Sequence, residues 1–338
     1  MSNILPLALL AAATPVAPDP AETMIDVTAY GARPDSREDA TVAFQKAIQA
    51  VREAKDPVTL VIPKGRYDFF STHATRRACY YSNATERDSD AIRKIAIDLS
   101  DCKALTVEGN GSELVMRGAM TMLVAERCQD LTLRNLKFDF ARPTVSEITA
   151  VEKGDGYWIG KVHPDSTYRI EGGRIEWFGE DWSGVHNLVQ HCDPATESVW
   201  RGSDPTASAT SVIDTIGRRI RFAVPPATLD QVVVGRTYQF RDTRRSETGM
   251  WFNRSRNVSL SDLHIRSMAG FGVLFQYTEN IDLRRIRVAP VDASGRTCAS
   301  AADILHFSGC RGKIVVAKSI LTAAHDDAIN IHGTHLQV

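Results

Sequence analysis

The sequence lacks five features that would each place it in a familiar class. Its charges nearly cancel, with 40 lysines and arginines against 41 aspartates and glutamates, so it has no basic surplus for nucleic acid. No apolar run reaches the roughly 18 residues of a membrane span. The cysteines form no CxxC pair of the kind found in zinc sites, and neither a GxSxG elbow nor a phosphate-binding glycine loop occurs. With 43% hydrophobic residues in 338, the composition is that of a globular protein.

The first 24 residues carry features of a targeting signal. Ile4–Ala13 is apolar and is followed by small residues and prolines, the order of a signal-peptide core and its cleavage region. No lysine or arginine precedes this run, although signal peptides usually begin with one. We predict a signal peptide or disordered N-terminus over 1–24 and a secreted or periplasmic bacterial protein. A wrongly assigned start and an ordinary apolar tail are the alternatives.

The cysteines leave two interpretations open. An even number in an exported chain permits disulfides. A long chain with irregular spacings equally permits buried free thiols, which pack as small apolar side chains. The six are Cys79, Cys102, Cys128, Cys192, Cys298 and Cys310.

The segment 25–70 predicts two strands that flank a helix. One strand begins at residue 25, and Val58–Ile62 is the other. Between them, apolar residues of 39–55 recur at the i, i+3, i+4 and i+7 positions of one helix face, and Asp39 or Thr41 caps the helix start. The apolar face consists of Phe44, Ala47, Ile48 and Val51.

One pattern of alternating apolar residues followed by a polar break recurs from residue 103 onward. The steps between its copies are 26, 23 and 33 residues, and a polar stretch at Asp292–Arg296 explains the longest step. A β-solenoid coil has this length, and it buries its apolar side chains only against the next coil, about 4.8 Å away. A β-sandwich is the alternative, but the turns lack hairpin dipeptides. The copies are 104–109, 131–136, 258–263, 281–286 and 314–320.

The repeat is interrupted over 142–244, where half-buried strands alternate with Gly-Asp-Gly, Glu-Gly-Gly and Pro-Pro separators. These are antiparallel hairpin signals, and they predict an inserted β-rich domain, either decorative or used for substrate shaping or dimer contact. The N-terminal cap helix and first coils then occupy 25–141, and the remaining coils occupy 245–338. Because an uncapped last coil exposes its apolar end, we expect the chain to be a C-terminally truncated fragment.

The densest cluster of candidate catalytic groups lies near the C-terminus. Asp303 and Asp327 are 24 residues apart, one coil, which predicts positions on adjacent rungs, with Asp326 beside them. Three such carboxylates repel one another, so at least one should hold a proton near neutral pH. A carboxylic acid beside ionised carboxylates is what glycoside hydrolysis requires. Turn aspartates without a function and a metal site of three aspartates are the alternatives.

Two regions carry a resemblance to known families. Val27–Ala32, the helix after it and Val61–Tyr67 resemble the start of the pectate-lyase-like right-handed β-helix proteins. Asp303–Gly312 (DILHFSGCRG) and Asp326–Leu336 (DDAINIHGTHL) resemble glycoside hydrolase family 110, exo-acting α-1,3-galactosidases that remove terminal galactose from blood-group-B-type glycans. The resemblance implies an all-β fold, a right-handed parallel β-helix with an inserted small antiparallel β-barrel or sandwich.

The family resemblance also implies roles for individual residues. It makes the protein an inverting hydrolase in which Asp326 is the general acid and Asp303 and Asp327 jointly hold and deprotonate the water. The roles of Asp326 and Asp327 are exchangeable. Inversion predicts acid and base carboxyls roughly 6.5–9.5 Å apart. The residues expected to bind sugar hydroxyls, with burial as structural histidines as the alternative for two of them, are His306, Asn330 and His332.

A glycan is the expected partner, with neither a metal nor another cofactor, and a homodimer is a further expectation. Trp251 or Phe275 supplies an apolar face for the sugar, unless both are core residues. A polygalacturonase-like hydrolase or a polysaccharide lyase is the first alternative function, although only Arg311 and Lys313 lie near the aspartates as basic residues. A catalytically inert glycan-binding β-helix is the second.

Overall fold

The structure is a computed structural model that describes residues 22–54, 57–84, 91–184, 186, 188–241 and 247–333. Almost all of the predicted signal segment, 1–24, and the C-terminal Leu336–Val338 lie outside these ranges. Among the described helices, none has the length and apolar character to cross a bilayer.

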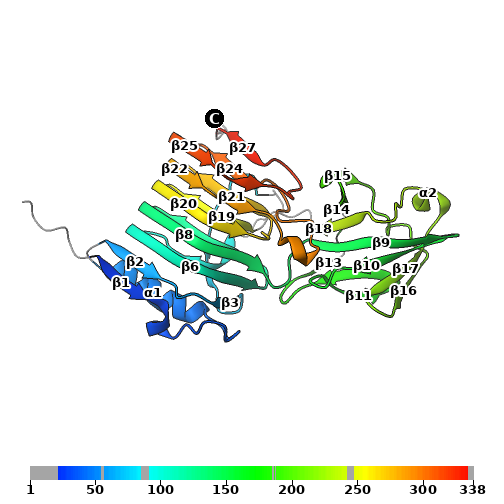
Figure 1. Cartoon of the computed structure of the whole chain (residues 1–338), viewed down its shortest axis with the longest axis horizontal. Coiled ribbons are helices and arrows are strands. Elements are labelled where there is room, and N and C mark those ends of the chain that lie inside the picture. The colour runs from blue at the N-terminus through cyan, green and yellow to red at the C-terminus, as the bar shows by residue number, and fades with distance from the viewer. Residues whose placement is uncertain are drawn as a thin grey trace, which may run out of the picture.

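Two parallel sheets form a β-helix, because the chain passes alternately from one sheet to the other as the coils stack (Figure 1). In the described chain, the first sheet contains β1 (Thr23–Asp26), β2 (Val58–Val61), β3 (Arg66–Phe70), β6 (Lys103–Arg117), β8 (Gln129–Phe140), β20 (Arg256–Ile265), β22 (Glu279–Arg284), β23 (Arg287–Val288), β25 (Arg311–Ala317) and β26 (Ile320–Leu321). The second contains β4 (Thr75–Ala78), β5 (Ile92–Asp98), β7 (Thr121–Glu126), β19 (Thr248–Asn253), β21 (Phe271–Gln276), β24 (Leu305–Ser308) and β27 (Ile329–His332).

The predicted repeat positions are direct partners in the first sheet. Leu105 pairs with Leu131, Leu131 with Val258, Val258 with Ile281, and Ile281 with Ile314. The pairing of Leu131 with Val258 bridges the interruption of the repeat, so β8 and β20 lie on consecutive coils. The predicted parallel β-helix is confirmed.

The coils turn at two series of left-handed corners. One series is the polar break of the repeat, where Asn135, Asp262, Arg285 and Lys318 have positive φ. The other corner follows strands β5, β7, β19, β21 and β24 of the second sheet, and the backbone there also has positive φ. Its amide donates to the next coil, as when Arg127 donates to the carbonyl of Asn253. Left-handed backbone is costly for most side chains, and the stacked ladder hydrogen bonds hold it in place. The residues at this second corner are Asp101, Arg127, Arg254, Tyr277 and Gly309.

The N-terminal helix α1 (Thr41–Glu53) covers the first coils with the predicted apolar face. Phe44, Ala47, Ile48 and Val51 are all buried. The helix begins two residues later than predicted because the Asp39 carboxylate accepts the Thr41 amide at 2.8 Å and acts as a cap. A short 3-10 helix, η1 (Val27–Tyr30), precedes it.

The chain between β8 and β19 forms a separate antiparallel sheet, seen to the right of the coils in Figure 1. It has its own buried cluster around Trp158, Phe222 and Tyr238. The predicted boundaries, 142 and 244, stay a prediction. The described strands are β9 (Ser146–Gly154), β10 (Tyr157–Val162), β14 (Leu188–Asp193), β15 (Ser198–Gly202), β16 (Ser211–Thr215), β17 (Arg219–Ala223) and β18 (Thr237–Arg241), with β11 (Thr167–Glu171), β12 (Arg174–Phe178) and β13 (Ser183–Gly184) in a small second sheet. Short helices are α2 (Pro226–Leu229) here and η2 (Asp292–Ser294) in the long coil.

All six cysteines fall within the described ranges, and there they carry free thiols. Burial raises the pKa of Cys102 to about 11 and that of Cys128 to about 12. The structure therefore shows free thiols rather than disulfides, with five of them buried and Cys310 partly buried.

Candidate active site

The three aspartates selected from the sequence meet on neighbouring coils. Asp303 lies just before β24, and Asp326 and Asp327 lie in the irregular segment before β27. The amide of Ile304 donates to the carbonyl oxygen of Asp327 over 2.9 Å, which joins the two segments. One carboxylate oxygen of each aspartate lies within 4.8 Å of those of the other two. Because the segment before β27 is not an extended strand, neighbours in sequence there can face one site.

Asp303 is buried, and two side chains hold its carboxylate. Its Oδ2 accepts hydrogen bonds from Nδ1 of His306 at 2.6 Å and from Nδ2 of Asn330 at 3.2 Å. Burial acts to raise the pKa of this carboxyl, but the contacts with His306 and Asn330 and an amide hydrogen bond outweigh it, so the pKa is lowered. Asp303 is therefore ionised at neutral pH and is not the protonated carboxyl expected among the three.

His306 and His332 continue this hydrogen-bond chain outward from Asp303. Their Nε2 atoms lie 2.7 Å apart, and Nδ1 of His332 lies 2.7 Å from the carbonyl oxygen of Gly333. A carbonyl oxygen only accepts, so Nδ1 of His332 carries a hydrogen. The ionised Asp303 likewise requires a hydrogen on Nδ1 of His306.

These hydrogen bonds determine which of the predicted sugar-binding residues can still contact a sugar. The His306 side chain is 1% exposed, and both of its ring nitrogens are engaged, so it has no nitrogen left for a sugar hydroxyl. His332 and Asn330 lie nearer the surface. The sequence analysis missed Asn83, whose Nδ2 lies 3.4 Å from His306 Nε2. Asn83 reaches this coil because Ser82 beside it donates its amide to Gln276 on β21.

His325 connects the segment before β27, which contains Asp326 and Asp327, to the inserted sheet. Its Nε2 donates to Oε1 of Gln239 on β18 at 2.8 Å, and its carbonyl oxygen accepts from Gln190 on β14 at 3.4 Å. Gln239 in turn donates to Thr297, and Thr297 donates to Glu147 on β9. Burial, with Arg241 and Arg201 nearby, lowers the pKa of His325 to about 3. A neutral, partly buried histidine next to Asp326 therefore holds this segment against the inserted sheet.

The nearest carboxylate oxygens of the three aspartates lie within 4.8 Å of one another, whereas the carboxyl groups of an inverting pair are roughly 6.5–9.5 Å apart. The expected separation of acid and base stays a prediction. Asp303 is buried and held by hydrogen bonds, and Asp326 and Asp327 are exposed.

A divalent cation is the chemical alternative for these carboxylates. Ca²⁺ takes roughly six to eight oxygen ligands, and the three aspartates would supply the protein's carboxylates to such an ion. The remaining positions would fall to water or substrate, because Asp326 and Asp327 face solvent. The expectation of no metal stays a prediction.

The two aromatic residues considered as sugar platforms are core residues. Phe275 stacks between Phe252 and Phe307 inside the β-helix, with ring centroids 4.8 and 5.1 Å apart. Trp251 is 2% exposed and packs against Tyr81. Neither ring is available to a sugar.

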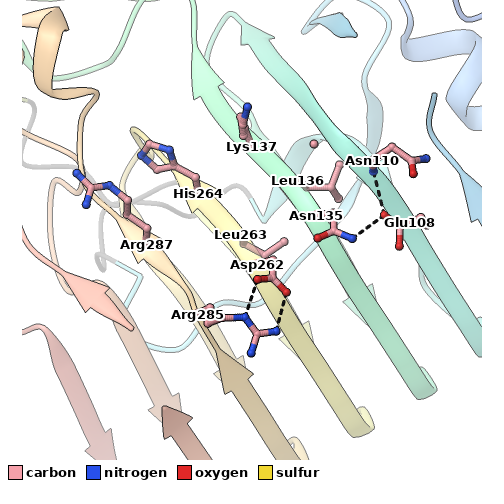
Figure 2. Close-up of a pocket in the computed structure, with 11 residues that line it drawn as sticks. Glu108, Asn110, Asn135, Leu136, Lys137, Asp262, Leu263, His264, Arg285 and Arg287 are labelled. Carbon is pink, nitrogen blue, oxygen red and sulfur yellow. Dashed lines mark hydrogen bonds and ion pairs between the residues drawn. The ribbon is translucent and has the colours of Figure 1, made fainter. Parts of the chain in front are cut away.

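A hollow of about 550 Å³ lies on the outer face of the first sheet, away from the three aspartates (Figure 2). Its carboxylates are already engaged. Asp262 forms two hydrogen bonds with Arg285, at 2.6 and 2.7 Å, and Glu108 accepts from Asn135 and from the amide of Asn110. These contacts stabilise a left-handed corner of the coils, so this hollow contains no catalytic carboxyl pair.

A β-helix protein with a carboxylate cluster on adjacent coils is the class that this fold and site define. A family model described as rhamnogalacturonase A/epimerase, pectate lyase-like, matches residues 24–77. Alpha-1,3-galactosidase A of Streptomyces avermitilis is 37% identical, over 98% of this chain and 56% of that protein. Alpha-1,3-galactosidase A of Bacteroides thetaiotaomicron is 36% identical, over 86% of this chain and 52% of that protein.

The comparisons confirm the resemblance to α-1,3-galactosidases, and the chain spans about half the length of the curated relatives it matches. Among solved structures, a hyperthermoactive exopolygalacturonase from Thermotoga maritima aligns with a TM-score of 0.33 and 10% identity, over 88% of this chain and 53% of that chain.

The partly buried His325 predicts a pH dependence of stability. In the unfolded chain a histidine binds a proton below its ordinary pKa of about 6.5, whereas the folded state binds none here until about pH 3. Stability from this group is therefore complete above about pH 6.5 and declines as the pH falls. When the pH is lowered from about 7.5 to 5, the free energy of unfolding should fall by about 2 kcal/mol less in His325→Gln than in wild type. Urea denaturation at both pH values measures this, and equal losses would contradict it.

Proposed function

We propose that this chain supplies the catalytic carboxylates of an exo-acting α-1,3-galactosidase. The substrate is a glycan with a terminal α-1,3-linked galactose, either branched as in blood group B or linear. The observation that carries the proposal is the meeting of three carboxylates within 4.8 Å on adjacent coils, in a chain that resembles α-1,3-galactosidases over 98% of its length. Export to the periplasm or the medium, where such glycans are met, is part of the proposal.

Asp303 suits the role of a base. It is ionised, and His306 and Asn330 restrict the carboxylate to one orientation. Its free oxygen lone pairs, together with Asp327, hold a water molecule and take its proton as the water attacks the anomeric carbon.

Asp326 is the general acid in this proposal, an assignment that rests on the family resemblance. It donates its proton to the glycosidic oxygen as the bond from the anomeric carbon to that oxygen breaks. Free galactose leaves with the hydroxyl of the attacking water, and the shortened glycan leaves with the proton of Asp326. The proton taken from water then returns Asp326 to its acid form through solvent.

The stereochemistry of the released sugar tests the mechanism. Proton NMR of the reaction with Galα1-3Gal carrying a fucose branch should show β-galactose before mutarotation, because water attacks opposite the departing oxygen. First appearance of α-galactose would mean a retaining mechanism, for which a short carboxylate spacing is typical. Absence of galactose release would contradict the proposed substrate.

Removal of the base should abolish turnover without unfolding the protein. Asp303→Asn keeps the shape of the side chain but cannot accept a proton, so kcat should fall by about 10²–10⁴-fold. Asp282→Asn, the same change at an exposed residue paired with Arg284 on β22, is the matched control and should retain full activity. Equal activities of the two variants would exclude Asp303 from catalysis.

Chelation separates proton transfer from metal chemistry. Carboxylates that transfer protons need no ion, so dialysis against EDTA should leave kcat/KM unchanged. Loss of activity that added Ca²⁺ restores would assign Asp303, Asp326 and Asp327 to a metal instead.

A further inference from the structure

A cavity of about 220 Å³ lies between the inserted sheet and the coils. The insertion contributes Trp182, His186 and Arg241 to its lining, and the coils contribute Glu247, Gly270 and Ala301. None of these residues belongs to the cluster of aspartates or to its hydrogen-bond partners. Ligand pockets for drug-sized molecules measure roughly 300–1,000 Å³, so this cavity suits a single sugar ring.

The coil residues that line the cavity belong, with the aspartates, to one column of stacked turns. Met268, Ser300 and Ala324 are ladder partners on three successive coils. Gly270 and Ala301 come one or two residues after the first two of these positions, on the coils where the cavity lies. Asp303 and Asp326 come two or three residues after Ser300 and Ala324. Since successive coils are about 4.8 Å apart, the cavity lies beside the aspartates, toward the N-terminal coils.

The chemistry of the lining fits a neutral sugar. Trp182 is partly buried and stacks on His186, with ring centroids 5.5 Å apart and planes inclined by 14°. Its indole Nε1 packs against Gly179, so the ring offers the cavity apolar aromatic surface. The formal charges of Arg241 and Glu247 cancel, which favours a neutral ligand over a uronate.

We propose that this cavity is a subsite for the neutral pyranose to which the terminal galactose is attached. This inference rests on the proposed function, which places the galactose at the aspartates and the scissile bond beside Asp326. The next ring then lies against Trp182, with its hydroxyls toward Arg241 and Glu247. The insertion thereby becomes part of the substrate-binding site.

Two substrates separate this subsite from the catalytic centre. Galα1-3Gal fills both sites, whereas α-galactosyl fluoride leaves the subsite empty because its leaving group is a single atom. Trp182→Ala should lower kcat/KM for the disaccharide about tenfold, or ~1.4 kcal/mol of transition-state binding, and leave that for the fluoride unchanged. Trp182→Phe keeps an aromatic surface and should recover much of the loss.

Trp200→Ala is the matched control, because Trp200 lies on the same insertion, is 39% exposed and contacts Arg236 rather than the cavity. It should act on both substrates as wild type does. An equal loss of Trp182→Ala on both substrates, or no loss on either, would overturn the subsite.

Failure of the proposed function has a different signature, namely a wild-type protein that releases galactose from neither substrate. Calorimetry with methyl β-galactoside then tests the cavity alone. Binding by wild type that Trp182→Ala loses supports the subsite, and equal heats for the two proteins overturn it.

Discussion

The register between successive coils is the constraint on which the rest of the structure depends. Parallel strands of adjacent coils pair residue for residue, and Phe252, Phe275 and Phe307 stack in line inside. A flat coil cannot bury its own apolar side chains, so each coil is stable only against its neighbours. Once the register is set, residues one coil apart in sequence become neighbours in space, and this brings the segments of Asp303 and Asp327 together.

The electrostatics of the site follow from where the ladder places each carboxylate. Asp303 is buried at the start of a strand, where a bare negative charge would be costly. Hydrogen bonds from His306 and Asn330 offset that cost. Asp326 and Asp327 lie on the next coil and are exposed. One cluster thus contains a buried, ionised carboxylate and two exposed carboxyl groups, an asymmetry that suits unlike roles in proton transfer.

The sequence predicted the structure well where the repeat of apolar residues determines which strands pair. Apolar alternation predicted the pairing of Leu105, Leu131, Val258 and Ile281, because a solenoid converts sequence spacing directly into contact. It could not predict that Asn83 reaches His306 or that His325 binds Gln239, because these pairs are 223 and 86 residues apart and outside the repeat. The lowered pKa of Asp303 could not be predicted either, because the contacts with His306 and Asn330 that outweigh its burial depend on side-chain geometry.

The inserted domain supplies a concave surface that a stack of regular coils lacks. The side of a stack of regular coils is nearly flat, and a binding site for a sugar needs a concave surface that surrounds it. The repeat cannot form that wall, because a change in one coil would break its pairing with both neighbours. A domain inserted between β8 and β20 leaves the pairing intact, since Leu131 still contacts Val258. Its larger sheet holds the segment of Asp326 and Asp327 through His325, and Trp182 lies beside its smaller sheet, next to β13. In the proposal above, one insertion therefore both positions the carboxylates and bounds the space beside them.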